Sequence, residues 1–352
     1  MTDHIQGKLN PIPPLKGNGV MMLADVIGKS GADTIANSGQ IIFHVAGDTG
    51  VPEIDQETRQ VMVTEAMQKD YDISHPENSP AFFLHLGDVI YGPNPNSFLD
   101  QFYRPYMHYQ GKIIAIPGNH DGESAAKMTA FQKYFCAPSQ SVPPIAGSIY
   151  RETMNQPGVY WLLDAPFVHI VGLYSNTAEN PGYISGNQIG QKQKDWLVKT
   201  LTSIKAQRDK GNKKGLIIAT HHPPFSGGGH SGSTQMLADI DDACQKANIY
   251  PHAFFSGHAH SIQRYMRTVQ SSSITDPIPY VITGCGGHGG QSVNPATPNQ
   301  KGNPVYAFSK AGWGYTKVQI NSTNLRITSY GVDWDQHRNP VITQVDTVSV
   351  KI

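Results

Sequence analysis

The sequence shows no imbalance of charge. Its 352 residues include 27 Lys and Arg against 27 Asp and Glu, and no long run or stripe of one sign occurs. Proteins that bind nucleic acid or an anionic membrane surface through their overall electrostatic field need such an excess. We therefore expect neither nucleic acid nor a membrane as a partner, and any binding site must be local.

Cysteine is scarce as well. Cys136, Cys244 and Cys285 lie far apart and form no CxxC or Cys/His finger pattern. This spacing excludes a disulfide framework and a zinc finger as organising features of the fold. We expect three ordinary thiols and assign no catalytic role to Cys285.

Long apolar stretches are missing too. Residues 1–19 are polar and rich in proline and glycine, without the charged start, apolar run and cleavage site of a signal peptide. No run elsewhere approaches the ~20 apolar residues of a membrane span. The default expectation is a cytoplasmic protein; a secreted or periplasmic location stays open if a leader precedes this sequence.

Short apolar runs alternate with helical patterns over residues 41–260, and strands dominate after that. Strands are expected at 41–46, 81–86, 112–116, 215–220 and 252–256, and helices at 188–208 and 234–247. The pattern predicts an α/β fold with two mixed sheets packed face to face and helices outside, a four-layer αββα sandwich. We expect residues 1–35 to be an N-terminal extension packed on the core, and residues 36–352 to be a single catalytic domain.

Five of these apolar runs stop at a polar residue that can bind a metal ion. The five endings are Asp48, Asp88, Asn119, His221 and His258. Because ligands of open α/β sheets bind beyond the carboxyl ends of the strands, the five side chains are expected to converge. Each ending alone has an ordinary explanation, since Gly-Asp and Asn are common in turns and helix caps. Their joint occurrence indicates one site.

Two further residues extend this pattern. His260 lies two positions after His258, and alternate residues of an extended segment point the same way. Tyr91 lies three positions after Asp88, where a half-buried aromatic is the ordinary interpretation. A tyrosine that binds metal must lose a proton whose pKa is near 10. If Tyr91 is a ligand, the ion beside it is expected to be hard and highly charged.

Five motifs occur in the order GDTG (47–50), GDVIY (87–91), GNHD (118–121), HHPP (221–224) and GHAH (257–260). Together they resemble the five motif blocks of the metallophosphoesterases, the calcineurin-like superfamily, over residues 41–260. Many members of that family carry Asp-x-His in the first block, whereas Thr49 and Gly50 follow Asp48 here. The missing histidine is offset by Tyr91, as in the purple acid phosphatases, which this sequence resembles most.

The resemblance implies a centre of two metal ions. It implies a first ion held by Asp48, Asp88, Tyr91 and His260, and a second held by Asp88, Asn119, His221 and His258, with Asp88 as the bridge. Three anionic oxygens and one imidazole suit Fe(III) at the first site, and the second set suits Zn, Mn or Fe(II). Two ions with a total charge of +5 and the three anionic ligands Asp48, Asp88 and Tyr91 give the centre a net charge of +2. A bridging hydroxide lowers this net charge to +1, which still attracts a phosphate dianion.

The same resemblance implies roles for residues beside the metals. His221 is preferred to His222 as the ligand, because in the family's pattern the ligand stands two residues before the proline. The resemblance implies that His230 contacts the substrate, that His120 protonates the leaving group and that Asp121 orients His120. For His120 and His230, an ordinary surface histidine is the alternative.

We expect hydrolysis of small phosphate monoesters by in-line attack of a metal-activated hydroxide. A phosphodiesterase, including one for cyclic nucleotides, is the first alternative, although the Asp-x-His start associated with those enzymes is absent. A non-catalytic scaffold of the same fold is the second alternative, and it is expected to have lost ligands, none of which is missing. The glycine-rich loop 284–290 is either a mobile turn or brings His288 near the site. The physiological phosphoester, the second metal and the oligomeric state stay open.

Overall fold

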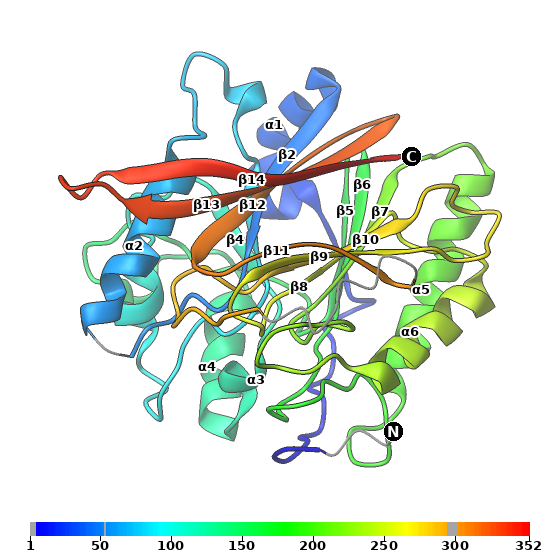
Figure 1. The fold of residues 1–352 in the computed structure, drawn as a ribbon, viewed down its shortest axis with the longest axis horizontal. Helices are drawn as coiled ribbons and strands as arrows, with labels where there is room; N and C mark the ends of the chain where they lie inside the picture. Colours follow the sequence, from blue (N-terminus) through cyan, green and yellow to red (C-terminus); the bar gives the residue numbers. More distant parts are fainter. Residues whose placement is uncertain (1–4, 53, 294–301) are drawn as a thin grey trace.

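The computed structural model describes residues 5–52, 54–293 and 302–352, and its strands form two sheets (Figure 1). The six-stranded sheet has the order β14 (Pro340–Lys351), β13 (Asn324–Trp334), β12 (Trp313–Asn321), β2 (Gln40–Ala46), β3 (Phe82–His85) and β4 (Lys112–Ala115). Its strands β2, β3 and β4 are parallel, whereas β12, β13 and β14 pair antiparallel, so the sheet is mixed.

The eight-stranded sheet is mixed as well. Its order is β1 (Val20–Met22), β5 (Trp161–Ala165), β6 (Val168–Gly172), β7 (Gly215–Thr220), β8 (Ala253–Ser256), β10 (Ile278–Thr283), β9 (Ile262–Arg267) and β11 (Val305–Lys310). The strands β6, β7, β8 and β10 are parallel to one another. The strands β9 and β11 continue the sheet with antiparallel pairing, and β5 and β6 form an antiparallel hairpin.

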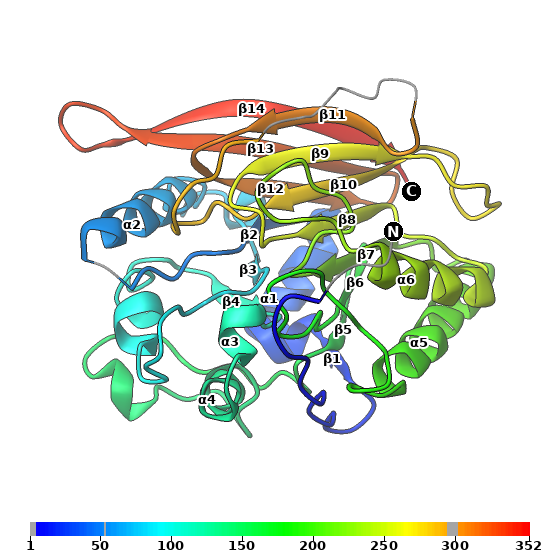
Figure 2. The ribbon, with the colours of Figure 1, turned by 60° about the horizontal axis from the view of Figure 1, so that its bottom comes forward.

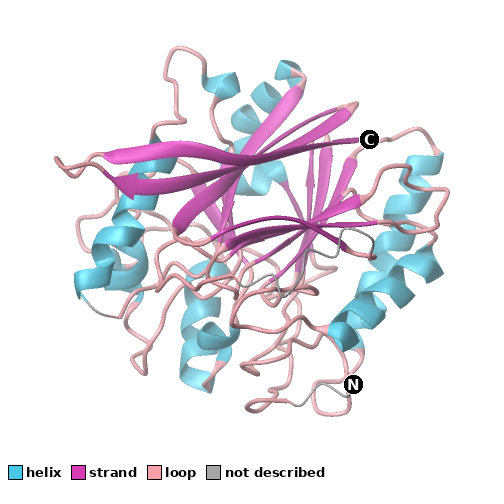
Figure 3. Cartoon of the chain, in the orientation of Figure 1, coloured by secondary structure: helices cyan, strands magenta, loops and turns pink. Residues whose placement is uncertain are grey.

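Helices lie outside the strands (Figure 3). The α-helices are α1 (Leu23–Ser38), α2 (Ile54–Gln68), α3 (Asn119–Gly122), α4 (Ala125–Phe135), α5 (Lys192–Asp209) and α6 (Thr234–Ala247). Short 3-10 turns occupy Pro76–Asn78 and Pro144–Ala146, and one π-helical turn occupies Leu99–Tyr103. The helices α5 and α6 run side by side beside the eight-stranded sheet (Figure 2).

Successive residues of the central strands serve two different cores. In β6, Ile170 joins the core shared with the six-stranded sheet, which includes Phe43 of β2. The next residue, Val171, packs instead with Leu197 of α5 and Ile240 of α6. Because a strand turns successive side chains to opposite faces, both faces of this sheet are buried. The result is the α/β sandwich of two mixed sheets flanked by helices that the sequence pattern predicts.

Most predicted elements lie within a few residues of their expected bounds, and α6 occupies the predicted 234–247. The predicted extension 1–35 contains β1, which pairs with β5, and most of α1; its first four residues lie outside the described residues. All three cysteines are buried free thiols, as expected. Within the described ranges, no helix combines the length and apolarity that crossing a bilayer demands.

Candidate metal centre

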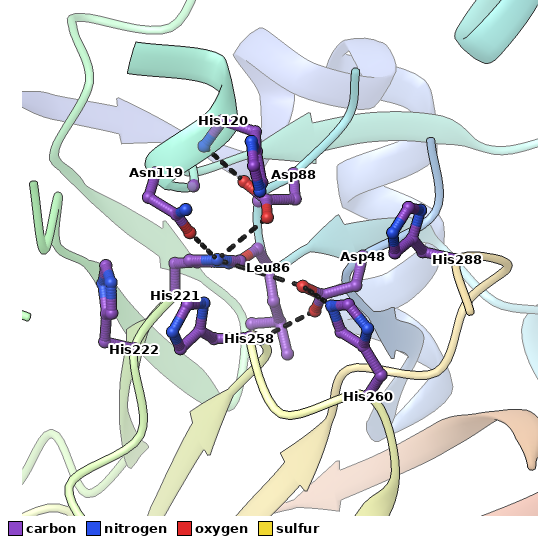
Figure 4. Close-up of polar contacts among 12 residues, drawn as sticks. Asp48, Leu86, Asp88, Asn119, His120, His221, His222, His258, His260 and His288 are labelled. Carbon is purple, nitrogen blue, oxygen red and sulfur yellow. Dashed lines mark hydrogen bonds and ion pairs between the residues drawn. The ribbon is translucent and has the colours of Figure 1, made fainter. Parts of the chain in front are cut away.

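The five residues predicted at strand ends come from both sheets. Asp48, Asp88 and Asn119 follow β2, β3 and β4, whereas His221 and His258 follow β7 and β8. Figure 4 shows these five side chains gathered in one place and directed toward one another. The structure therefore brings together residues that lie up to 210 positions apart in the chain.

Three of these residues turn the chain in an unfavourable backbone conformation. Asp48, Asp88 and His258 have φ angles of 57°, 53° and 64°. This left-handed region is uncommon for residues other than glycine and costs on the order of 1–3 kcal/mol per residue. Each of the three directly follows a glycine at the end of a strand. The surrounding fold holds these three residues in the strained conformation at the positions where their side chains enter the cluster.

The loops around the carboxylates pack closely because two positions are glycine. A Cβ atom on Gly118 would collide with Asp88 Oδ1, and one on Gly284 would lie 2.8 Å from Asp48 Oδ2. Real Cβ atoms essentially never approach another atom within 3.0 Å. Gly118 and Gly284 therefore allow neighbouring loops to enclose the two carboxylates.

One group of donor atoms forms around Tyr91. The Tyr91 hydroxyl donates to Asp48 Oδ1 at 3.3 Å and lies 3.4 Å from His260 Nε2. On the other side of its ring, His260 donates from Nδ1 to the Gly289 carbonyl at 2.9 Å. Because that carbonyl can only accept, the lone pair of a neutral His260 must lie on Nε2. A phenol, a carboxylate and an imidazole nitrogen thus face one another.

A second group of donor atoms forms around His221. His221 Nε2 lies 3.3 Å from Asp88 Oδ2 and 3.0 Å from Asn119 Oδ1, while Nδ1 donates to the Leu86 carbonyl at 2.8 Å. Ligating atoms of Asp88, His221 and His258 all lie within 4.8 Å of one another. The two groups adjoin, because His221 Nε2 is only 3.9 Å from Asp48 Oδ1.

Electrostatics at the cluster favour bound cations. Burial raises the pKa of Tyr91 well above its usual value, and Asp88 and Asp48 raise it further, so this phenol ionises only beside a strong positive charge. Burial lowers the pKa of His221, but Asp88 and Asp48 outweigh burial and raise it to about 10. Carboxylate and phenol oxygens with imidazole nitrogens also form a donor set that suits metal ions. The residues therefore fit the metal centre that the sequence predicts.

A carboxylate other than that of Asp121 lies beside the His120 ring. His120 Nδ1 lies 3.0 Å from Glu123 Oε2, so Glu123 holds the ring. Asp121 instead accepts hydrogen bonds from the backbone N–H groups of Val89, Ile90 and Gly118. Burial and the nearby Asp88 raise the pKa of Asp121 to about 6. Asp121 thus ties the Asp88 loop to the Gly118 loop, and the carboxylate in contact with the His120 ring is that of Glu123.

His230 lies over the second group of donors. Its ring centroid is 4.1 Å from that of His258. His230 Nε2 pairs with Gln291 Nε2 at 2.9 Å, and Nδ1 lies 3.5 Å from Glu179 Oε1. His222, the ligand that was not preferred, pairs through its two nitrogens with Ser175 and the Ala178 carbonyl.

The loop 284–290 closes over the first group. His288 stacks on Tyr91 with ring centroids 3.8 Å apart and an interplanar angle of 5°, and its Nδ1 donates to the Gly50 carbonyl. The sequence alone does not place this loop, nor does it indicate Glu123, Glu179 or Gln291 as residues of the site. None of these three follows an apolar run, and no motif marks them, so the sequence carries no signal for their place in the site.

The comparison with protein families gives the class of the protein. Residues 43–261 match the family model Metallophos, the calcineurin-like phosphoesterases. This segment contains every predicted metal ligand and covers more than half of the chain, so the chain belongs to the calcineurin-like phosphoesterase family. No curated protein sequence matches the chain significantly.

Solved structures with similar folds include a purple acid phosphatase and other proteins. Purple acid phosphatase PPD1 from yellow lupin (Lupinus luteus) seeds has a TM-score of 0.61 and 14% identity, covering 90% of this chain and 54% of that one. GAP50, described as the anchor in the inner membrane complex of Plasmodium, has a TM-score of 0.61 and 13% identity, covering 89% of both chains. PhoD has a TM-score of 0.59 and 14% identity, and the match covers 89% of this chain and 70% of PhoD. This chain thus spans about half the length of the lupin phosphatase, and at these identities the likeness shows the fold alone.

Proposed function

We propose that this phosphoesterase is a metal-dependent phosphatase that hydrolyses small phosphate monoesters at a centre of two ions, as the purple acid phosphatases do. The observation that carries the proposal is the pair of adjoining donor groups around Tyr91 and His221. His221, His258 and His260 each donate from one ring nitrogen to a backbone carbonyl, which leaves the other nitrogen free to bind an ion. A small phosphoester is the proposed partner, with neither nucleic acid nor a membrane.

The two donor groups differ in hardness. The proposed first site consists of Asp48, Asp88, Tyr91 and His260, and the proposed second site of Asp88, Asn119, His221 and His258. The first set supplies three anionic oxygens and suits Fe(III), whereas the second contains an amide and two imidazoles and suits Zn, Mn or Fe(II). When bound, the two ions supply an activated water as the nucleophile and positive charge for the phosphoryl oxygens.

Two histidines complete the proposed chemistry. His120 gives a proton from Nε2 to the leaving group while Glu123 holds Nδ1. His230 contacts the phosphate of the bound substrate. Since His230 Nε2 pairs with Gln291, contact through this nitrogen requires the Gln291 side chain to give way.

Substitution Tyr91→Phe tests the first site. A tyrosinate bound to Fe(III) gives a purple or violet charge-transfer band, so we expect wild type to contain iron and to show this band. The variant should lose the band, because phenylalanine has no oxygen to bind iron. Metal analysis and a visible spectrum of both proteins measure this. A colourless, iron-free wild type with full activity would refute the assignment of Tyr91.

A comparison of substrates tests the reaction. Monoester and diester turnover are measured with the same alcohol group and the same metal loading. Faster turnover of monoesters agrees with the proposal, and a strong preference for diesters contradicts it. Absence of both activities from a protein loaded with metal would favour a non-catalytic scaffold.

A further inference from the structure

Glu179 touches the proposed second metal site with both its side chain and its backbone. It lies in the loop that follows β6, away from all five sequence motifs. Glu179 Oε2 accepts a hydrogen bond from Asn119 Nδ2 at 3.1 Å, and Oε1 lies 3.5 Å from His230 Nδ1. The Glu179 carbonyl accepts from His258 Nε2 at 2.7 Å. Two of the four proposed ligands of the second ion therefore depend on this one residue.

The side chain of Glu179 decides which way the Asn119 amide faces. An ionised carboxylate can only accept hydrogen bonds, so the amide group must turn its NH₂ toward Glu179. The Asn119 oxygen then faces inward, 3.0 Å from His221 Nε2. Only the amide oxygen is a metal ligand, whereas the NH₂ group would repel an ion. A neutral amide in place of Glu179 can donate as well as accept, so it would no longer impose this orientation.

The backbone of Glu179 decides the tautomer of His258. Because the Glu179 carbonyl accepts from Nε2–H, the lone pair of neutral His258 must lie on Nδ1. Partners of this kind, outside the ligands themselves, set ring orientation and ligand basicity at metal sites. Correct placement of the loop is therefore needed for both Asn119 and His258.

The N-terminal segment holds this loop in place. Glu179 N–H donates to the Gln6 carbonyl, and Gln6 N–H donates to the Asn180 carbonyl, each at 2.7 Å. Further along, the Asn176 side chain accepts from the Asn10 N–H and donates to the Asn10 carbonyl, each at 2.8 Å. Residues 6–10 therefore brace the loop that carries Glu179, although they contact none of the predicted ligands through these bonds.

We propose that Glu179 is a positioning residue that sets the affinity of the second metal site by fixing the Asn119 amide. This inference rests on the proposed two-ion centre and adds a residue that no motif indicates. It also gives the N-terminal segment a place in the enzyme, as the brace of the Glu179 loop. The first site, around Tyr91, does not depend on Glu179.

Substitution Glu179→Gln tests this role in the full-length protein. With Fe(III) in the first site, we expect the dissociation constant for added Mn(II), followed by electron paramagnetic resonance, to rise about 10–100-fold. The visible tyrosinate band should stay unchanged. Glu179→Ala should weaken Mn(II) binding as well, because it removes the acceptor altogether. This second variant is needed because the amide oxygen of a glutamine could still accept a hydrogen bond from Asn119.

Glu77→Gln is the matched control. Glu77 has 41% of its side chain exposed and lies 3.3 Å from His75, against 44% and 3.5 Å from His230 for Glu179. The control should bind Mn(II) like wild type. Equal Mn(II) affinity in wild type and both Glu179 variants would overturn the proposal. Loss of the visible band together with Mn(II) binding would overturn it too, because the substitution would then disrupt both metal sites and not the second site alone. A wild type that binds neither iron nor Mn(II) would instead refute the proposed function itself.

Discussion

His120 keeps one ring nitrogen in a contact with Glu123 and leaves the other for chemistry. Its side chain is 31% exposed, and its ring lies 4.5 Å from the ring of Tyr91. The His120 backbone N–H donates to Asp88 Oδ1, so the residue is anchored to a proposed metal ligand. In this position the His120 side chain can contact a substrate that is bound at the ions.

Substitution His120→Asn should slow hydrolysis selectively. An alkyl phosphate has a poor leaving group that needs a proton, so we expect kcat to fall about 10²–10⁴-fold. An activated aryl phosphate leaves without protonation and should lose far less. The measurement is kcat for both substrates at one metal loading, with Glu77→Gln as the surface control. Equal losses for the two substrates would exclude the role of leaving-group acid.

At the scale of residues, the sequence predicts which side chains meet but not what holds them. Asp48, Asp88 and His258 each follow an apolar run, and that local signal is enough to place them at the sheet edge. Glu179 meets Asn119 across 60 positions of chain, and its contact depends on the path of a loop. Asp121 is next to His120 in the sequence, but it accepts hydrogen bonds from backbone N–H groups of Val89 and Gly118, because nearness in sequence says little about where a buried carboxylate finds its donors.

At the scale of elements, a charged cluster links the strands β5, β6 and β7. Asp164 of β5 lies opposite His169 of β6 in the ladder, and Lys214 just before β7 donates to Asp164 at 2.6 Å. Burial raises the pKa of Asp164, but the nearby His169, whose Nε2 lies 3.4 Å from Oδ1, and the hydrogen bond from Lys214 outweigh burial and lower the pKa to about 2. The ionised carboxylate therefore stabilises the fold above the unfolded-state pKa of 3.8, and this contribution fades as the pH falls toward 2.

Substitution Asp164→Asn should remove this contribution. Because the site is partly exposed, we expect the free energy of unfolding to fall by about 1 kcal/mol at pH 7. The difference in the free energy of unfolding between wild type and the variant should become smaller between pH 5 and pH 3, because protonation of Asp164 removes its stabilising contribution from wild type. Urea unfolding across this range measures the gap. Asp209→Asn, which removes an exposed helical ion pair with Lys205, should cost less than about 0.5 kcal/mol. A constant gap across this range would contradict the interpretation.

Elements with weak periodicity escaped prediction from sequence. The strand β1 has three residues, too few to show alternation. The helix α1 contains Gly28 and Gly31 and is interrupted at Gly28, where φ is 79°, so its apolar residues do not follow one helical period. The strand β11 lies at the edge of its sheet and no residue of it is fully buried, and its apolar run of four residues is too short to separate a strand from a loop. Strands buried on both faces, such as β7, show continuous apolar runs and were predicted.

At the scale of the whole molecule, the centre lies where two sheets meet. One sheet contributes Asp48, Asp88 and Asn119, and the other contributes His221 and His258. Carboxylates and imidazoles therefore come from opposite sides of the sandwich. An ion held between them joins the two sheets, so metal binding and global stability are expected to be linked.

Removal of metal should lower the stability of the whole chain. Asp48, Asp88 and Asp121 are at most 1% exposed, and without cations these buried carboxylates repel one another. An ion present at 1,000 times its dissociation constant stabilises the folded state by about 4 kcal/mol. Its removal by a chelator should therefore lower Tm by on the order of 5 °C or more. Thermal melts at one scan rate, with and without chelator and after metal is restored, measure this. Asp88→Asn should melt at nearly the same temperature with or without chelator, because it lacks the bridging carboxylate. An unchanged wild-type Tm would argue that the fold is stable without ions, as expected of a scaffold.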